Sequence, residues 1–339
     1  MSKSGKRVEK KKKWKIGRII LVAVFILIIA AGIGAGSFIS GKLSNLNIQE
    51  IDTTNLAVNS ELYNDVSDSL SKKEFEDVIC IALFGTDSRD TDNMSAGRSD
   101  SIIIASINPK LKNIKLISIP RDTYVNVPGY GKTKINHAYA YGGEQLTIKT
   151  INENFGLDIT EYATIDFSGL IHIINKLGGI QMNITKAEME YINNHCHESY
   201  KITGKTTKKV SSYGNVTLTG EQALTHSRNR TVGSDFTRAG RQREVLEAIM
   251  NKMVKLGTSK ILDLSDSFLK EVKTNIKVTD YVGQLTNIMM NSSDYMNNIT
   301  SIQIPSTDYA KGQTIGGVYY FVSDAQTMKQ DMIDNIYKK

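Results

Sequence analysis

The chain is poor in the residues that most often carry covalent catalysis or bind structural zinc, with two cysteines and five histidines among 339 residues. The spacing of Cys80 and Cys196 leaves a disulfide between them open without requiring one. His195, Cys196 and His197 look like metal ligands, but no second ligand pair lies nearby in the sequence, which disfavours a zinc site. A Walker P-loop and a Gly-x-Ser-x-Gly elbow are also missing. These absences disfavour nucleotide hydrolysis by a P-loop and covalent acyl transfer.

Acidic residues are scarce only at the amino terminus, where residues 1–18 hold nine Lys or Arg and the single acid Glu9. This tail accounts for the formal net charge of +7, because the rest of the chain holds 33 basic and 34 acidic residues. The basic balance of the whole chain therefore does not indicate nucleic-acid binding, and we expect no nucleic-acid partner.

One long apolar run is present. Residues Ile19 to Ser40 include no formal charge over 22 positions, which is enough for a helix to cross a bilayer. The run is too long for a typical signal-peptide core, and no clear cleavage site follows it. Because the positive flank precedes it, the positive-inside rule predicts a cytoplasmic amino terminus. We expect a single-pass cell-membrane protein whose chain after Lys42 is extracellular.

The remaining sequence predicts one extracellular α/β domain over residues 74–339, after a polar juxtamembrane spacer at 41–73. Strands mingle with helices at intervals that indicate a mixed sheet covered on both faces. Residues 194–217 are rich in Lys, Ser and Thr and resemble a mobile flap. We expect strands at about 77–84, 101–107, 114–119, 162–166, 180–184 and 299–304, and helices at about 143–154, 167–177, 220–226, 238–256, 261–270 and 324–337.

Two aspartates follow or begin predicted strands. Asp87 comes after the apolar run that ends at Gly85, and Asp100 stands at the mouth of the next strand. A single acid at a strand end is more often a turn former. Two at adjacent strands can share a Mg²⁺ or Mn²⁺ ion, which would relieve their mutual repulsion. We therefore expect a metal site at Asp87 and Asp100.

Arginines gather after the same strands, and guanidinium groups fit phosphate oxygens. Arg98 precedes Asp100, and Arg121 with Asp122 follows the predicted strand at 114–119. The last part of the cluster consists of Arg228, Arg230, Arg238, Arg241 and Gln242, of which the final three share a helix face. A solvated helix face is the alternative for any one of these stretches. Together they predict a site for a pyrophosphate.

The motifs GTDSRD, RSDSIIIASINPK, LISIPRDTYVNVPGYGKTKINHAYAYGG, RNR and TRAGRQREVL resemble those of the LytR-CpsA-Psr family, in the same order, over residues 78–254. The resemblance implies a membrane-anchored phosphotransferase with an α-β-α fold around a mixed sheet. It also implies a long apolar pocket for a prenyl chain, which we expect to be lined by helices such as residues 167–177. Such enzymes move teichoic acid or capsular polysaccharide from an undecaprenyl-pyrophosphate carrier to peptidoglycan.

The resemblance also assigns roles to residues. It implies metal binding by Asp87 and Asp100, a central Arg121, and pyrophosphate binding by Arg228, Arg230, Arg238 and Gln242, to which we add Arg98. Arg243 replaces a glutamine of the family pattern, which leaves its local contacts in question.

The predicted reaction is a phosphoryl transfer, which needs alignment and neutralised charge more than covalent help. The residues do not single out a general base. Asp122 is one candidate, and orienting Arg121 is its alternative role. Two other functions remain open: a non-catalytic lipid-binding or envelope-regulatory protein, and a metal-dependent lipid pyrophosphatase with water as the acceptor.

Overall fold

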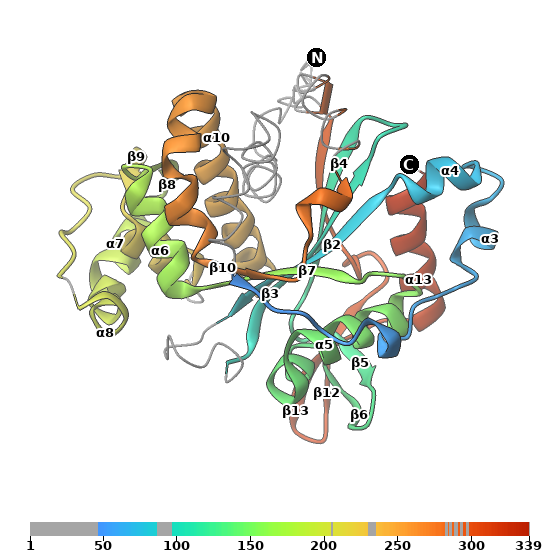
Figure 1. The fold of residues 1–339 in the computed structure, drawn as a ribbon. Helices are drawn as coiled ribbons and strands as arrows, with labels where there is room; N and C mark the ends of the chain where they lie inside the picture. Colours follow the sequence, from blue (N-terminus) through green and yellow to red (C-terminus); the bar gives the residue numbers. More distant parts are fainter. Residues whose placement is uncertain are drawn as a thin grey trace, which may run out of the picture.

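A seven-stranded mixed sheet forms the centre of the molecule (Figure 1). The structure is a computed structural model that describes residues 47–86, 97–204, 206–229 and 235–338, apart from some positions between 282 and 297. The strands of the sheet lie in the order β1 (Asn47–Ile48), β10 (Val272–Thr274), β7 (Glu161–Asp166), β2 (Ile79–Thr86), β3 (Ser99–Asn108), β4 (Asn113–Ile119) and β11 (Ile299–Gln303). Parallel pairs (β1 with β10, β2 with β7, β4 with β11) mix with antiparallel ones. The mixed sheet was correctly predicted from the sequence.

The central strands are apolar on both faces, as strands of a doubly covered sheet should be. In β2, Ile81 and Leu83 belong to one hydrophobic cluster, while Ala82 and Phe84 belong to another on the opposite face. Because side chains alternate along a strand, these continuous apolar runs supply two cores at once. The α-β-α layering expected from the family resemblance follows from this pattern.

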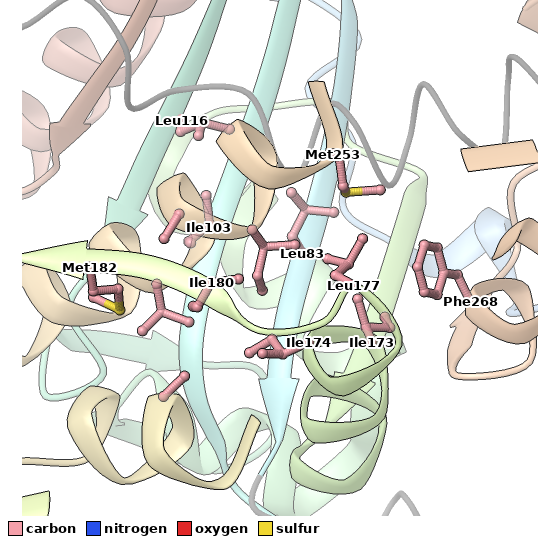
Figure 2. Close-up of a cluster of buried hydrophobic side chains, with 14 of the residues drawn as sticks. Leu83, Ile103, Leu116, Ile173, Ile174, Leu177, Ile180, Met182, Met253 and Phe268 are labelled. Atoms are coloured by element: carbon pink, nitrogen blue, oxygen red, sulfur yellow. The ribbon is translucent and has the colours of Figure 1, made fainter. Parts of the chain in front are cut away.

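Four longer helices and a short one cover the first face (Figure 1). They are α6 (Phe167–Lys176), α7 (Lys186–His195), α8 (Tyr200–Thr203), α9 (Gly220–Ser227) and α10 (Asp235–Leu269). Figure 2 shows Leu83 and Ile103 of the sheet among Ile173 of α6, Leu177 directly after α6, and Met253 of α10. A separate two-stranded antiparallel sheet of β8 (Ile180–Ile184) and β9 (Gly214–Leu218) packs into the same cluster.

The second face is covered by α3 (Leu62–Val66), α4 (Lys72–Glu76), α5 (Asn136–Phe155) and α13 (Ala325–Ile333). Two hairpins lie beside α5 in Figure 1. These hairpins are β5 (Tyr124–Val127) with β6 (Gly131–Lys134), and β12 (Lys311–Ile315) with β13 (Val318–Val322).

Residues 47–73 correct the predicted spacer. Leu56, Leu62, Val66 and Leu70 are buried in the core of the second face, and β1 adds a strand to the sheet edge. Many polar residues separate these three leucines and Val66, so the sequence did not reveal that the four side chains are buried. This segment is therefore part of the folded domain.

Three further details differ from the predictions. Strand β8 pairs with β9 outside the central sheet. Part of the predicted flap is ordered, because β9 lies in it and Asn193 exchanges two hydrogen bonds with Val210 (2.7 and 2.9 Å). The two helices expected at 238–256 and 261–270 are the single helix α10. A helix tolerates an interior glycine such as Gly257 when tertiary packing outweighs its low propensity.

No helix within the described ranges is long and apolar enough to span a membrane. The predicted span at Ile19 to Ser40 lies outside those ranges. Cys80 and Cys196 are both buried, reduced thiols, and they belong to the clusters on opposite faces of the sheet. The sheet between them rules out a disulfide in this fold.

Candidate active site

An apolar pocket opens between the carboxyl ends of β2 and β7 and the helices of the first face. It contains about 950 Å³ of empty space, including space open to solvent. Its walls are mostly aliphatic and aromatic, from Leu83, Ile103, Ala163, Ile165, Phe167, Leu170, Ile173, Leu224, Val245, Ile249 and Val272. Helix α6 contributes Phe167, Leu170 and Ile173, as expected for residues 167–177. The pocket has the shape and chemistry to hold an extended hydrocarbon chain.

The pocket exists because the strand ends carry small residues. Gly85 of β2 lies opposite Ser101 of β3 in the register. A Cβ atom on Gly85 would come within 3.1 Å of the Cβ of Ser101. Ala163 of β7, which pairs with Leu83, also has a short side chain and lines the pocket. Larger side chains here would fill the space above the sheet.

A second, polar pocket adjoins the apolar one. The two share Asp100, Ser101, Ile103 and Gln242. We call the second one the polar pocket because it contains the charged side chains of Arg121 and Asp122 as well as Asp100. Its other walls come from Ile102, Ser118, Ile119, Pro120, Gln303, Tyr319 and Phe321. An amphipathic ligand could thus place its apolar part in one pocket and its charged part in the other.

Strand register brings Asp100 and Arg121 together. Ile102 of β3 pairs with Ile119 of β4, so Asp100 and Arg121 lie two residues beyond the pair on opposite strands. Arg121 Nη1 donates to Asp100 Oδ1 at 3.0 Å. Gln242 of α10 reaches the backbone carbonyl of Asp100 through a long contact of 3.5 Å. The predicted convergence of these three residues is therefore present.

Asp122 is held between two cations. Its Oδ1 accepts from Lys134 Nζ at 2.6 Å, and its Oδ2 lies 3.5 Å from Arg121 Nε. Its side chain is only 7 % exposed. Because each oxygen of this carboxylate faces a cation, the side chain fixes the direction of the Arg121 guanidinium group. The geometry favours the orienting role of Asp122 over that of a base.

Arg98 and Arg228 flank the pockets. Arg98 is exposed, two residues before Asp100. The charge of Arg98 acts on His137 of α5. Burial lowers the pKa of His137, and the nearby charges of Arg98 and Lys134 lower it further. Arg228 caps the end of α9, and its guanidinium carbon lies 5.1 Å from the ring centre of Phe167 in the apolar pocket. This cation–π contact holds a positive charge at the rim of the pocket.

Arg241 does not join the site, although it was expected to share the face of Gln242. Its Nε donates to Glu188 Oε1 of α7 at 2.9 Å, and its Nη1 donates to the carbonyl of Asn229 at 3.2 Å. Burial would raise the pKa of Glu188, but hydrogen bonds from Thr185 and Arg241 outweigh it and hold the pKa below its usual value. Arg241 thus ties α10 to α7.

Three predicted site residues cannot be placed. Asp87 and Arg230 lie outside the described ranges, and for Arg238 the structure describes the backbone in α10 but not the side chain. Asp87 directly follows Thr86, which pairs with Ser99 beside Asp100. Among the described residues, no three His, Cys, Asp or Glu side chains form a group that could hold a metal ion. His195, Cys196 and His197 therefore form no such group.

Lys134, Gln303 and Tyr319 belong to the site but were not singled out from the sequence. Lys134 lies in one of the family-like motifs, where its charge opposite Asp122 could have marked it. Gln303 and Tyr319 come from β11 and β13, far along the chain. The pairing of β11 with β4 brings Gln303 near, and contacts of β13 such as the hydrogen bond from Phe321 N to the Asp122 carbonyl at 2.9 Å bring Tyr319 near.

Comparison with known proteins identifies the family. The LytR_cpsA_psr family model matches residues 45–336. The chain belongs to the LytR-CpsA-Psr family. Among its curated relatives is the polyisoprenyl-teichoic acid–peptidoglycan teichoic acid transferase TagT of Bacillus subtilis (strain 168), 32 % identical over 289 residues, which are 83 % of this chain and 84 % of the relative. TagU of Enterococcus faecalis (strain ATCC 700802 / V583) is 31 % identical over 270 residues, 78 % of this chain and 80 % of TagU.

Solved structures of the LytR-CpsA-Psr family share the fold. TagT bound to LIIa-WTA has a TM-score of 0.59 at 30 % identity and covers 78 % of this chain and 92 % of the TagT chain. The family protein YwtF (TagT) with bound octaprenyl pyrophosphate lipid has a TM-score of 0.55 at 28 % identity, with the same coverage. The first of these TagT structures contains LIIa-WTA and the second an octaprenyl pyrophosphate lipid.

Proposed function

We propose that this LytR-CpsA-Psr protein transfers a glycopolymer of the teichoic acid or capsular polysaccharide type from a polyprenyl-pyrophosphate carrier to peptidoglycan. One observation carries the proposal: the apolar pocket and the polar pocket are neighbours that share the lining residues Asp100 and Gln242. A prenyl chain would occupy the first pocket and its pyrophosphate the second. The names of TagT and TagU support the same reaction class.

The reaction would form a bond between a hydroxyl oxygen of peptidoglycan and the phosphorus that carries the glycopolymer. The bridging P–O bond of the pyrophosphate would break, prenyl phosphate would leave with the electron pair, and the proton of the attacking hydroxyl would pass to the departing phosphate or to water. Arg121 would hold non-bridging oxygens, in a direction set by Asp122. Arg228, Arg230, Arg238 and Gln242 would hold the remaining phosphate oxygens, and Arg98 stands at the exposed rim.

Asp100 and Asp87 are the residues that would hold Mg²⁺. Asp100 provides a carboxylate in the polar pocket, 12 % exposed, and Asp87 follows the adjacent strand end. Mg²⁺ commonly uses one or two carboxylates together with waters and phosphate oxygens, so this donor set fits. The bound ion would supply charge neutralisation at the pyrophosphate. On this proposal, Ile19 to Ser40 anchors the extracellular domain at the membrane that contains its lipid substrate.

The full-length chain, in vesicles that contain a polyprenyl-pyrophosphate-linked glycan, tests the proposal. With Mg²⁺ and peptidoglycan, we expect prenyl phosphate to be released and the glycan to become covalently attached to peptidoglycan. Release without attachment would identify a lipid pyrophosphatase. Binding of the donor without release would identify a non-catalytic lipid-binding protein.

A further inference from the structure

One row of paired residues runs across the central sheet and lines both pockets. Ala163 of β7 pairs with Leu83 of β2, and Leu83 pairs in turn with Ile103 of β3. Ile103 pairs with Ser118 of β4, which pairs with Gln303 of β11. Directly paired residues point to the same face of a sheet, so these five side chains form one line. Neighbouring strands lie about 4.8 Å apart, so the line extends for about 19 Å.

The row changes from apolar to polar along its length. Ala163, Leu83 and Ile103 line the apolar pocket. Ile103, Ser118 and Gln303 line the polar pocket. A ligand that lies along the row would therefore meet hydrocarbon at one end, and a hydroxyl and an amide at the other.

The charged side chains stand beside the middle of the row. Asp100 lies near the start of β3 and Arg121 directly follows β4, so their ion pair joins the third and fourth strands of the row. The pyrophosphate of a carrier lipid would lie there, between the apolar part and the uncharged polar part. Gln303 comes from β11, one strand further on. A group bonded to the distal phosphate would therefore enter the space above β4 and β11.

Tyr319 of β13 forms a wall of the same space. Tyr319 and Phe321 both line the polar pocket, and they share one face of β13 because they lie two residues apart. Phe321 ties this strand to the site. Its backbone N–H donates to the carbonyl of Asp122 at 2.9 Å, and it forms a parallel bridge with Thr123. The side chain of Tyr319 is 43 % exposed and so remains accessible to a ligand.

Both Tyr319 and Gln303 are held in position. Gly312 of β12 lies diagonally opposite Tyr319, which pairs with Thr314. A Cβ atom on Gly312 would come within 2.7 Å of Cε2 and of the phenol oxygen of Tyr319, so the ring lies over a place where a side chain would displace it. Gln303 Nε2 donates to the carbonyl of Pro305 at 3.3 Å. A preformed wall binds a ligand with little ordering cost.

The chemistry of this wall suits a sugar. Ser118, Gln303 and Tyr319 carry no charge but can donate and accept hydrogen bonds. Phosphate oxygens are bound more strongly by cations such as Arg121, on another wall of the polar pocket. A membrane surface would instead favour an apolar or basic patch. Sugar hydroxyls exchange hydrogen bonds with neutral groups, and the C–H face of a sugar can lie on a tyrosine ring.

The order of the pockets matches the order of the parts in a lipid-linked glycan. Such a donor consists of a prenyl chain, a pyrophosphate and a first sugar bonded to the distal phosphate, and the site offers apolar, charged and neutral polar walls in that order. We infer that Ser118, Gln303 and Tyr319 bind the first sugar of the lipid-linked donor, an inference that rests on the proposed transferase function. The acceptor glycan has the same sugar chemistry, so binding of the donor alone distinguishes the two sources.

The double variant Gln303→Ala/Tyr319→Phe of the full-length chain tests the inference without an acceptor. Binding is measured in detergent with Mg²⁺ to two probes: octaprenyl pyrophosphate, and the same lipid with a single N-acetylglucosamine on its distal phosphate. Because the variant loses two neutral hydrogen-bonding groups, its binding of the sugar-bearing lipid should weaken by about 10-fold. Its binding of bare octaprenyl pyrophosphate should stay within about 2-fold of the wild type, which also shows that the variant is folded.

Matched substitutions serve as controls. Gln313→Ala/Tyr213→Phe removes the same two groups from exposed residues outside the linings of both pockets, and it should bind both lipids as the wild type does. Tyr319→Ala should weaken binding of the sugar-bearing lipid more than Tyr319→Phe does, because the face of the ring is lost together with the hydroxyl.

Two results would overturn the inference. An equal loss of binding for both lipids would assign the wall to the pyrophosphate. Unchanged binding of the sugar-bearing lipid would show that the wall does not hold the donor sugar, and a raised KM for peptidoglycan in the same variant would assign the wall to the acceptor. A wild-type chain that binds neither lipid would reject the proposed function together with the inference. The expected binding without any transfer would reject the proposed function alone.

Discussion

The two faces of the sheet are built from the same strands but end differently at the edge that carries the site. On the second face, Phe84 and Tyr139 fill the space, with their rings 5.7 Å apart in an edge-on arrangement. On the first face, Gly85, Ser101 and Ala163 leave the apolar pocket. The pocket thus coincides with small residues on the first face, next to a shift in the register of β2 and β3 between Gly85 and Thr86.

The faces also use charge differently. On the second face, Glu144 accepts from Lys273 Nζ at 3.0 Å, from Tyr139 at 2.8 Å and from Thr164 at 3.2 Å, and all four side chains are buried. The charged groups at Asp100 and Arg121 are more exposed, 12 % and 21 %, and they line a pocket. The first set of contacts is the more deeply buried, although Glu144 and Lys273 also contribute to the wall of a shallow pocket beside Tyr162.

The largest expected effect comes from the closed network. Lys273→Met would leave the Glu144 carboxylate buried without its cation, at a cost of roughly 3–5 kcal/mol in the free energy of unfolding. Urea denaturation of the full-length chain in detergent measures it. Lys329→Met, which removes the exposed ion pair with Asp65, is the control and should cost under about 1 kcal/mol. Equal losses in the two variants would contradict the structural role of the network.

Arg121→Ala tests the open network. Because Arg121 is available to phosphate oxygens, we expect kcat for transfer to fall by about 10²- to 10³-fold, with little change in stability. Arg121→Lys should rescue only part of the loss, because an ammonium group cannot form the bidentate fork. The control is Lys110→Ala, which removes the surface ion pair with Glu74 and should leave transfer unchanged. Near wild-type turnover in Arg121→Ala would refute the assigned role.

A matched pair of alanine substitutions compares the faces directly. Ala82→Leu adds bulk to the filled second face and should destabilise the fold by roughly 1–3 kcal/mol. Ala163→Leu adds the same bulk to the wall of the apolar pocket, where there is space, and should weaken binding of a polyprenyl pyrophosphate by about 10-fold at little cost in stability. Denaturation and lipid-binding measurements on both variants give four values. Equal losses of stability and of lipid binding in the two variants would contradict the difference between the two faces.

Much of the fold could be predicted because local patterns are strong in its centre. The continuous apolar runs that form β2, β3 and β4 predict strands by themselves, and the turn-forming residues between β3 and β4 predict the hairpin that joins them. Short elements escaped detection. Strand β10 has only three residues and depends on β7 for its hydrogen bonds, while β12 and β13 are mostly exposed and show no core pattern. Their formation depends on long-range pairing, which local sequence does not encode.

The site divides in the same way. Asp100 and Arg121 were predictable because each adjoins a strong strand, and strand ends meet at one edge. Arg241 was misjudged, since helical spacing places it near Gln242 but cannot reveal the buried carboxylate of Glu188 on another helix. Gln303 and Tyr319 were missed because only tertiary packing brings β11 and β13 to the pocket.

The smallest expected effect concerns the ion pair on the pocket face, Glu188 with Arg241, which is the counterpart of Glu144 with Lys273. The pKa of Glu188 is lowered in the folded state, so the unfolded chain takes up the proton more readily. Its contribution to stability is therefore complete above the unfolded pKa of about 4.3 and is lost as the pH falls through the lower folded value. The free energy of unfolding of Glu188→Gln should be lower than that of the wild type by roughly 1 kcal/mol at pH 7, and this difference should be smaller at about pH 3.5. A gap that is independent of pH would mean that Glu188 acts through packing rather than through the charge of its carboxylate.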